Sequence, residues 1–407
     1  MNSLFAWRYF KAKKSANAIN IIAWVTVSVI AFATACQILV LSVFNGFEDL
    51  VKSLYASFYA DIKITPAKGK TCVLSAEQLR SLQQQPGVNG ISLIAEEKAL
   101  LKNGDDQTIV YLKGVDSNYT KVTGVGSKIV DGVFDIGTAE DPRLVVGAGI
   151  QNSVSISVED PNISKLTVIL PKIKINSSDP LESLSEGTAK AAGVFAIQQE
   201  FDSKYAITNI DFVKQQMGFA ADEYSAAEIK LNNNADVQAI QQQLSKLLGS
   251  TYLVQTKYEQ NTSLYNTMKL EKWFIYAILT LILIIAAFNM VSALTMLVLE
   301  KKKDISILQS MGAGKTRILK IFLSEGLLLG SIGAATGILL ASIICIIQLK
   351  YKLVKLEGGS FLIDYFPVKL QASDFLLVAV TALVIAFIAS WLPASKAARQ
   401  TFELRGS

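Results

Sequence analysis

The sequence has no histidine among its 407 residues and only three cysteines. Histidine is the commonest side chain for acid–base catalysis and metal binding near neutral pH. Two of the cysteines, Cys36 and Cys345, lie in long apolar runs, so Cys72 has no partner for an intrachain disulfide. The sequence therefore offers neither a histidine-based site nor a disulfide framework.

Charged residues are also scarce, at 18% of the chain against 51% hydrophobic residues, whereas about a quarter of a soluble domain is charged. Four stretches carry no charge at all: those between Lys14 and Glu48, between Lys272 and Glu300, between Glu325 and Lys350, and between Asp374 and Lys396. Each holds about 20 or more mostly apolar residues, enough helix to cross a hydrocarbon core of roughly 30 Å. We predict four transmembrane helices; the alternative is four core helices of a soluble protein.

The positive charges at the ends of these runs predict the orientation. Lysine and arginine clearly exceed acidic residues in the N-terminal arm, in the loop 300–320 and in the C-terminal tail, whereas the loop 350–374 is nearly balanced. Because such an excess marks the cytoplasmic side, both termini and the loop 300–320 are predicted to be cytoplasmic. The stretch "ATAC" (33–36) resembles a lipoprotein cleavage site, but its apolar run exceeds the 7–15 residues of a signal peptide. The first span is therefore expected to remain as an anchor.

These observations divide the chain into nine predicted segments. They are a cytoplasmic interfacial arm (1–19), a first span with a stalk (20–47), an external α/β domain (48–272) with an inserted β subdomain (about 131–200), a second span (273–299), a cytoplasmic loop (300–320), a third span (321–349), an external loop (350–374), a fourth span (375–395) and a cytoplasmic tail (396–407).

The large external segment has the pattern of a mixed α/β domain. β-branched enrichment and alternation predict strands at "DIKITP", "QTIVYLKGV", "AAEIKLN" and "STYLVQT". Helices are predicted after Ser75, a typical N-cap residue, and over 235–248, which ends at Gly249. The segment "PKIKINSSDPLESLSEG" in the inserted subdomain is predicted to be a protruding loop or hairpin tip.

The acidic residues of this domain show no catalytic or metal-binding spacing. Asp61, Asp116, Asp131 and Asp135 are scattered, and a solvated surface explains each of them best. Basic residues are not interleaved with aromatic ones, so no nucleic-acid binding is expected. No metal site is predicted either.

The stretch "MGAGKT" (311–316) resembles the second half of a phosphate-binding loop. The full motif is G-x-x-x-x-G-K-[ST] after a buried strand, but position 309 is Gln309 rather than glycine, and the preceding "EKKKDISILQS" predicts a charged turn and a short amphipathic helix. We therefore predict a turn between helices and no nucleotide site. The short helix is expected either to lie at the membrane surface or to dock on a cytoplasmic partner.

Two further features lie inside the predicted spans. Pairs of glycines four residues apart, Gly326/Gly330 and Gly333/Gly337, permit close helix packing, within the subunit or between subunits. Asn289 is polar within the second span and is expected to face protein or a cleft instead of acyl chains.

Three long stretches carry a specific resemblance. "LVLSVFNGFEDLVKSLY", "DPRLVVGAGI" and the segment from "KLEKWFIYAIL" to "GSIGAATG" resemble the permease subunit of the bacterial lipoprotein-releasing ABC transporter, the LolC/LolE family of MacB/FtsX-like permeases. The resemblance covers essentially the whole chain and is strongest over 265–340. It implies four transmembrane helices with a MacB-like periplasmic domain, in the bacterial inner membrane.

The same resemblance implies partners and a division of labour. A separate pair of ATPase subunits would bind ATP and Mg²⁺, so that this chain has no cofactor and no catalytic residue of its own. A second permease subunit, identical or paralogous, would complete the membrane part. Lipoproteins would leave the outer leaflet, enter a cleft between the first and second membrane helices of the two permeases, and pass to a soluble periplasmic carrier.

The resemblance also places three sets of residues. The ATPase contact would be formed by Lys302, Lys303, Asp304, Ile305, Leu308, Met311 and Gly312, with Ile305, Leu308 and Met311 as the apolar contacts. The carrier contact would fall at Pro171, Lys172, Ile173 and Lys174, although this segment does not match the hook sequence of the carrier-recruiting member. The membrane cleft would be lined by Val43, Phe44, Asn45, Phe47, Phe274 and Ile278.

Two other functions fit the same superfamily. A signalling scaffold of the FtsX type, which activates a cell-wall hydrolase, usually has a much smaller external domain. An efflux permease of the MacB type usually carries its ATPase on the same polypeptide. Both therefore fit this chain less well than lipoprotein release.

Overall fold

The computed structural model describes residues 17–158, 165–173, 183–356 and 363–399. The chain forms two compact units, one made of residues 1–50 and 266–407 and the other of residues 51–265. We call their described parts the helical unit and the extramembrane domain.

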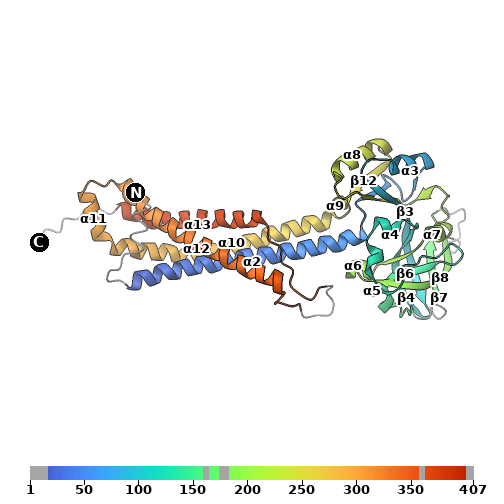
Figure 1. The fold of residues 1–407 in the computed structure, drawn as a ribbon, viewed down its shortest axis with the longest axis horizontal. Helices are drawn as coiled ribbons and strands as arrows, with labels where there is room; N and C mark the ends of the chain where they lie inside the picture. The colour runs from blue at the N-terminus through green and yellow to red at the C-terminus, as the bar shows by residue number, and fades with distance from the viewer. Residues whose placement is uncertain (1–16, 159–164, 174–182, 357–362, 400–407) are drawn as a thin grey trace. The chain divides into compact units, whose positions relative to one another are not determined.

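Each of the four charge-free runs lies in one long helix of the described chain. They are α2 (Asn17–Phe58), α10 (Thr262–Glu300), α12 (Lys315–Tyr351) and α13 (Ala372–Arg399). All four are long and apolar enough to span a membrane, which confirms the four predicted spans. In the helical unit they lie side by side (Figure 1) around a shared apolar cluster that includes Val27, Met290, Leu329 and Ala386, one from each helix.

The paired glycines of α12 pack within the chain. A Cβ atom on Gly326 or Gly330 would collide with Ser390 or Ala386 of α13. On Gly333 or Gly337 it would collide with α2, at Ile30 and at the carbonyl of Ala31. The structure thus decides between the two predicted uses of these glycines: they bring α12 into close contact with α13 on one side and with α2 on the other.

The extramembrane domain is built on one mixed sheet. Its described strands are β1 (Ile62–Pro66), β3 (Val88–Asn103), β4 (Asp106–Val115), β5 (Ile129–Gly132), β6 (Arg143–Gly147), β7 (Lys165–Pro171), β8 (Leu184–Phe195), β9 (Tyr205–Asn209), β11 (Ala226–Leu231) and β12 (Tyr252–Thr256). They run in the order β12-β1-β11-β3-β4-β9-β6-β8-β5, with β7 paired to β3 and β8. β2 (Cys72–Val73) and β10 (Glu223–Tyr224) form a separate short ladder.

The strands of the predicted insertion (about 131–200) share this sheet with the flanking segments. β6 pairs with β9, and β7 pairs with β3 as well as with β8. The pairs β4–β9 and β6–β8 are parallel and the remaining pairs are antiparallel, which makes the sheet mixed, in agreement with the predicted α/β class.

Short helices connect or cover these strands. They are α3 (Ala76–Gln83), α4 (Tyr119–Val122), the 3-10 turn η1 (Val125–Lys128), α5 (Ala148–Ser153), α6 (Gln199–Asp202), α7 (Ile210–Met217), α8 (Val237–Leu248) and α9 (Lys257–Gln260). The predicted caps are confirmed. Ser75 forms a capping box with Gln78, and Gly249 ends α8 with a φ of 72°. Because such caps use only neighbouring residues, sequence alone predicts them well.

Candidate functional sites

The loop between α10 and α12 contains α11 (Lys302–Ser310), as predicted for a short amphipathic helix. Ile305 is only 2% exposed and packs with Val298, Ile318 and Phe322 of the helical unit. Ile307 and Met311 are 58% and 79% exposed. Of the three predicted apolar contacts, Ile305 therefore anchors the helix to its own chain, Leu308 is half-buried and Met311 is open to solvent or to a partner.

The polar residues of the predicted ATPase contact lie around this helix. Lys302 and Lys303 are exposed, and Asp304 is half-buried and paired with Lys301 at 3.3 Å. Whether these residues touch an ATPase stays a prediction. The exposed side chains of this loop combine two cations with two large apolar groups, a suitable composition for a docking surface.

The "MGAGKT" stretch ends one helix and begins the next. Gly312 has a φ of 87°, its N–H donates to the carbonyl of Gln309, and the N–H of Ala313 donates to the carbonyl of Leu308. This pattern is a Schellman motif, which requires a left-handed residue and so favours glycine. Gly314 then caps α12. Since a helix and not a buried strand precedes the turn, the local fold is not that of a phosphate-binding loop, as expected.

The predicted carrier contact lies at the end of the β7–β8 hairpin. Lys172 is exposed and its N–H donates to the carbonyl of Ser183 at 2.8 Å, while Pro171 is half-buried. Ile173 packs against the core of the domain, and its N–H donates to the carbonyl of Met217. Lys174 lies outside the described residues. The hairpin base is thus ordered by the sheet, and among the three of these residues that the structure describes Lys172 is the exposed one.

The predicted cleft residues divide into three groups. Phe274 and Ile278 on α10 are 67% and 59% exposed. Phe44 is half-buried, as is Phe47, which packs edge-on against Phe366. Asn45 is buried at 1% exposure, so it does not line an open surface in this conformation.

Asn45 belongs instead to a polar junction in the helical unit. Its amide nitrogen donates to Asp374 at 2.6 Å, and its carbonyl oxygen accepts from Lys272 at 2.9 Å. Lys272 also pairs with Asp374 at 3.1 Å and donates to Gln371 at 3.3 Å. One residue from each of α2, α10 and α13 therefore meets at this point.

Val43 contributes to an apolar groove in the same unit. The groove has a volume of about 430 Å³ and runs between α2, α12 and the residues Leu353, Val354, Phe366 and Val368. Its one polar wall residue is Gln348, whose amide binds the backbone of Val354 and Phe366. That amide is therefore occupied in holding the loop, and the groove offers only hydrocarbon contacts.

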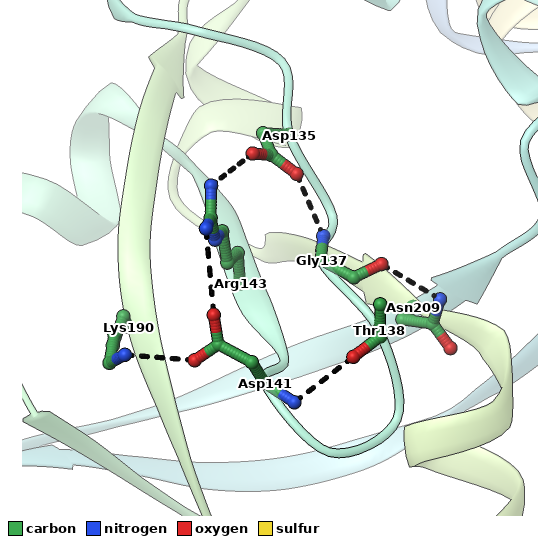
Figure 2. A network of polar contacts seen from close by, with 7 residues as sticks. All are labelled: Asp135, Gly137, Thr138, Asp141, Arg143, Lys190 and Asn209. Atoms are coloured by element: carbon green, nitrogen blue, oxygen red, sulfur yellow. Dashed lines mark hydrogen bonds and ion pairs between the residues drawn. The ribbon is translucent and has the colours of Figure 1, made fainter.

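Figure 2 shows a polar network on the loop before β6 in the extramembrane domain. Arg143 lies between Asp135 and Asp141 and pairs with both, and Lys190 of β8 also binds Asp141, at 2.8 Å. Asn209 donates to the carbonyl of Gly137 at 3.1 Å. The charged side chains are 38–47% exposed, so the network shapes the loop at the surface and resembles no buried catalytic site.

The four aspartates predicted to be solvated behave differently from one another. Asp131 is exposed. Asp135 belongs to the network above, and Asp116 accepts from the hydroxyl of Ser92 and the N–H of Leu93. Asp61 binds Lys257 at 3.0 Å and Lys230 at 3.1 Å. Asp135 keeps a 38% exposed side chain at the surface, as predicted. The prediction was wrong for Asp61, whose side chain is only 20% exposed, and incomplete for Asp116, because the partners of both come from distant parts of the chain.

A buried ion pair, which the sequence did not reveal, joins two strands of the domain. Lys113 of β4 binds Glu228 of β11 at 2.7 Å, and the ammonium group also lies 4.9 Å from the ring centres of Phe58 and Tyr119. Phe58 is the last residue of α2 and stacks on Phe201. The only hint in the sequence is a lysine at an inward position of the alternating strand "QTIVYLKGV".

Comparison with known proteins gives matches along nearly the whole chain. The family model of the MacB-like periplasmic core domain matches residues 23–247, and that of the FtsX-like permease C-terminal domain matches residues 276–402. The chain is 27% identical to the lipoprotein-releasing system transmembrane protein LolE of Haemophilus influenzae, with 98% of each chain covered. It is 25% identical to the corresponding LolC of Xylella fastidiosa, with 96% of this chain and 95% of that one covered.

A solved structure is also similar in part. The periplasmic region of MacB from Actinobacillus actinomycetemcomitans has 12% sequence identity and a TM-score of 0.36, and the match covers 50% of this chain and 92% of that one.

Proposed function

The chain belongs to the family of the MacB-like periplasmic core domain, and from this membership we propose that it is the permease subunit of a lipoprotein-releasing ABC transporter. The observation that carries the proposal is the end-to-end similarity to relatives named as transmembrane proteins of the lipoprotein-releasing system. The fold agrees with it, since four apolar helices and a large mixed α/β domain occur in the order that the family models require.

In this proposal the chain lies in the bacterial inner membrane with both termini in the cytoplasm. The lysines of the loop 300–320 support that orientation by the positive-inside rule. The extramembrane domain would then be periplasmic. ATP and Mg²⁺ would be bound by a separate ATPase, and this chain would be a non-catalytic subunit that converts nucleotide-driven movement into release of the substrate.

The ATPase would contact α11. Ile305 packs against α12 and α13 and thereby fixes the orientation of α11 about its own axis. In this orientation Ile307 and Met311 are exposed. A force applied to these side chains would reach the membrane helices through the packing of Ile305 against Ile318 and Phe322. Lys302 and Lys303 would supply charge complementarity at the rim of the contact.

A second permease subunit would cover α10. This helix is the least buried of the four spans, and its exposed side chains include Phe274, Ile278, Ile285 and Phe288. Asn289 is exposed on the same helix. An amide in contact with acyl chains would lack hydrogen-bond partners, so its position favours contact with protein or with a polar part of the substrate.

The substrate class follows from the relatives' printed name and from the surface chemistry. Acyl chains of a lipoprotein would lie in a cleft between the exposed apolar side chains of α10 and the second permease subunit, at about 0.8 kcal/mol per buried methylene. The protein part would be passed to a periplasmic carrier, for which the β7–β8 hairpin with Lys172 is our candidate contact.

Depletion of the protein in its native cell tests this function. Pulse-labelled lipoproteins are followed through separation of inner and outer membranes, and a plasmid copy of the wild-type chain serves as the control. We expect lipoproteins to accumulate in the inner membrane and the plasmid copy to restore sorting. Normal sorting together with altered drug sensitivity or cell separation would instead support efflux or division signalling.

A further inference from the structure

The apolar groove that includes Val43 has a preformed wall. The side-chain amide of Gln348 donates to the carbonyls of Val354 and Phe366 and accepts from the N–H of Val354. The N–H of Phe366 in turn donates to the carbonyl of Val354 at 3.1 Å. These bonds use the polar groups of the wall, so that the groove presents hydrocarbon without any rearrangement.

The loop that carries this wall is also fixed to α2. The N–H of Lys369 donates to the carbonyl of Ser42 at 2.9 Å. Gly46 lies so close to the backbone of Pro367 that a Cβ atom would not fit. The groove is therefore a built feature of the helical unit.

The groove lies on a different face of α2 from the contact with α10. Leu39, Val40 and Val43 line the groove, whereas Gln37 and Asn45 are bonded to Thr280 and Lys272 of α10. A helix turns by about 100° per residue, which places the two sets on roughly opposite faces. A molecule in the groove would therefore not enter between α2 and α10.

The groove lies at the end of the membrane-spanning part of α12. Its wall residues Ile344 and Ile347 come just before Lys350, where the uncharged run ends. Tyr351 and Tyr365 follow, and tyrosine is enriched where hydrocarbon meets lipid head groups. In a bilayer, an apolar groove at this level is exposed to the acyl chains of one leaflet.

Positive charge is concentrated next to the groove. The stretch 349–356 holds three exposed lysines and no acidic residue; they are Lys350, Lys352 and Lys355. Asp364 is the one acidic residue in the described stretch 363–371. This excess of cations is complementary to an anionic head group and not to a zwitterionic one.

Lys352 is in a backbone conformation that favours glycine. It follows the last residue of α12 with a φ of 50°, and its N–H donates to the carbonyl of Gln348 at 2.8 Å. Glycine would adopt this conformation at lower cost. Its ammonium group lies 4.1 Å from the ring centre of Tyr365, so the charge stays at this loop. The backbone gives no reason for a lysine here, whereas a bound anion does.

We propose that the groove is a binding site for an anionic phospholipid of the leaflet next to the loop 350–374. One acyl chain lies along Val43, Ile344 and Ile347, and the phosphate is bound by Lys350 and Lys352. The lipid fills the space between α2, α12 and the loop, and it is a resident lipid and not a transported one. This inference does not depend on the proposed function.

The test is photo-crosslinking in the purified complex with its partner subunits, in nanodiscs of phosphatidylethanolamine. The probe is phosphatidylglycerol with a photoactivatable group in one acyl chain, and peptide mass spectrometry locates the crosslinks. We expect them to concentrate at 39–43 and 344–348, several-fold above those of the matched phosphatidylcholine probe. An excess of a triacylated lipopeptide should not displace the probe.

Two variants with matched controls test the two parts of the site. Ile347→Trp fills the groove and should abolish the crosslinks, whereas Ile346→Trp, at an exposed neighbouring position outside the groove wall, should not. Lys352→Gly removes the charge from a position that glycine fits, so the fold should be retained while labelling falls several-fold. Lys269→Gln, at an exposed position of α10, is the charge control and should label like wild type.

The outcomes separate this site from other uses of the groove. Crosslinks spread evenly over all lipid-exposed helices, or labelling that survives Ile347→Trp, would overturn the site. Equal labelling by phosphatidylcholine would overturn the anionic head group, and displacement by the lipopeptide would assign the groove to the substrate. Labelling as expected in a complex that releases no lipoproteins would support the site and contradict the proposed function.

Discussion

Lys113 and Glu228 form a 2.7 Å ion pair in the interior of the extramembrane domain, with side chains only 2% and 1% exposed. The pair lies against Phe58, the last residue of α2, so two sheet strands and the end of this helix meet inside the extramembrane domain. The second carboxylate oxygen of Glu228 has no hydrogen-bond partner among the described residues. Removal of one of the two residues would leave the other as an unpaired charge in the interior, which costs free energy of folding.

We predict that Lys113→Met destabilises the protein strongly, since removal of one partner of a buried pair costs about 3–5 kcal/mol. The double variant Lys113→Met with Glu228→Met should recover most of this loss, because no unpaired charge remains. Thermal unfolding of the purified chain, followed by circular dichroism, measures both. Equal destabilisation in the single and double variants would show that packing, and not charge, dominates at this position.

The loop around α11 gives a second prediction. Met311→Asp and Leu308→Asp should leave membrane insertion intact and uncouple ATP hydrolysis from lipoprotein release, whereas Met311→Leu should behave like wild type. Ile305→Asp should lower the amount of folded protein, because it places a charge at a buried site. ATPase activity and release are measured on the same preparation. Normal release by both exposed-site variants would rule out α11 as the docking helix.

The packing of α12 gives a third prediction. Gly330→Leu and Gly337→Leu should both destabilise the helical unit, because no room exists beside Ala386 or beside the carbonyl of Ala31. Ala335→Leu adds a similar side chain to an exposed position of the same helix and should be tolerated. Yield and melting temperature in detergent are compared. If all three variants behave alike, the close approach of α12 to its neighbours is not required.

Asp61 gives a prediction about pH. Burial alone would raise the pKa of its carboxyl group, but the N–H of Leu231 and the ammonium groups of Lys257 and Lys230 outweigh burial and hold the pKa below its ordinary value. A carboxyl group with a lowered pKa in the folded state stabilises that state above the unfolded pKa of about 3.9, and this contribution disappears as the pH falls through the folded pKa.

Asp61→Asn should therefore be less stable than wild type at neutral pH, and the difference should shrink below about pH 4. Melting temperatures measured from neutral to acidic pH provide the test. Asp131→Asn, at an exposed position, is the control and should match wild type throughout. A difference for Asp61→Asn that stays constant over the whole range would mean that the ion pairs with Lys257 and Lys230 do not stabilise the fold.

The sequence was most informative where the cause is local or one-dimensional. The spans follow from the length of uncharged apolar chain, which a bilayer requires whatever the neighbours are. Ser75, Gly249 and Gly312 end or begin helices through bonds to residues a few positions away. The failure of "MGAGKT" as a phosphate-binding loop follows from the helix that precedes it, which its own periodicity predicted.

The sequence was least informative about which side of an element faces inward. Apolar residues at 305, 307, 308 and 311 cover more than one face of a short helix, and only packing against Phe322 and Ile318 decides that Ile305 is buried and Met311 exposed. The same holds for the aspartates predicted to be solvated. Asp61 meets Lys257, a residue almost two hundred positions away, and such a contact leaves no mark in local composition.

By itself, the sequence determined that this chain crosses a membrane four times and carries a mixed α/β domain between the first two spans, because hydrophobic length and strand alternation are properties of the chain alone. The tertiary structure decided that Asn45 is closed into a junction with Lys272 and Asp374, and that Ile305 rather than Met311 is the buried side chain of α11. These features depend on distant residues meeting in space, and only the packed fold specifies such meetings.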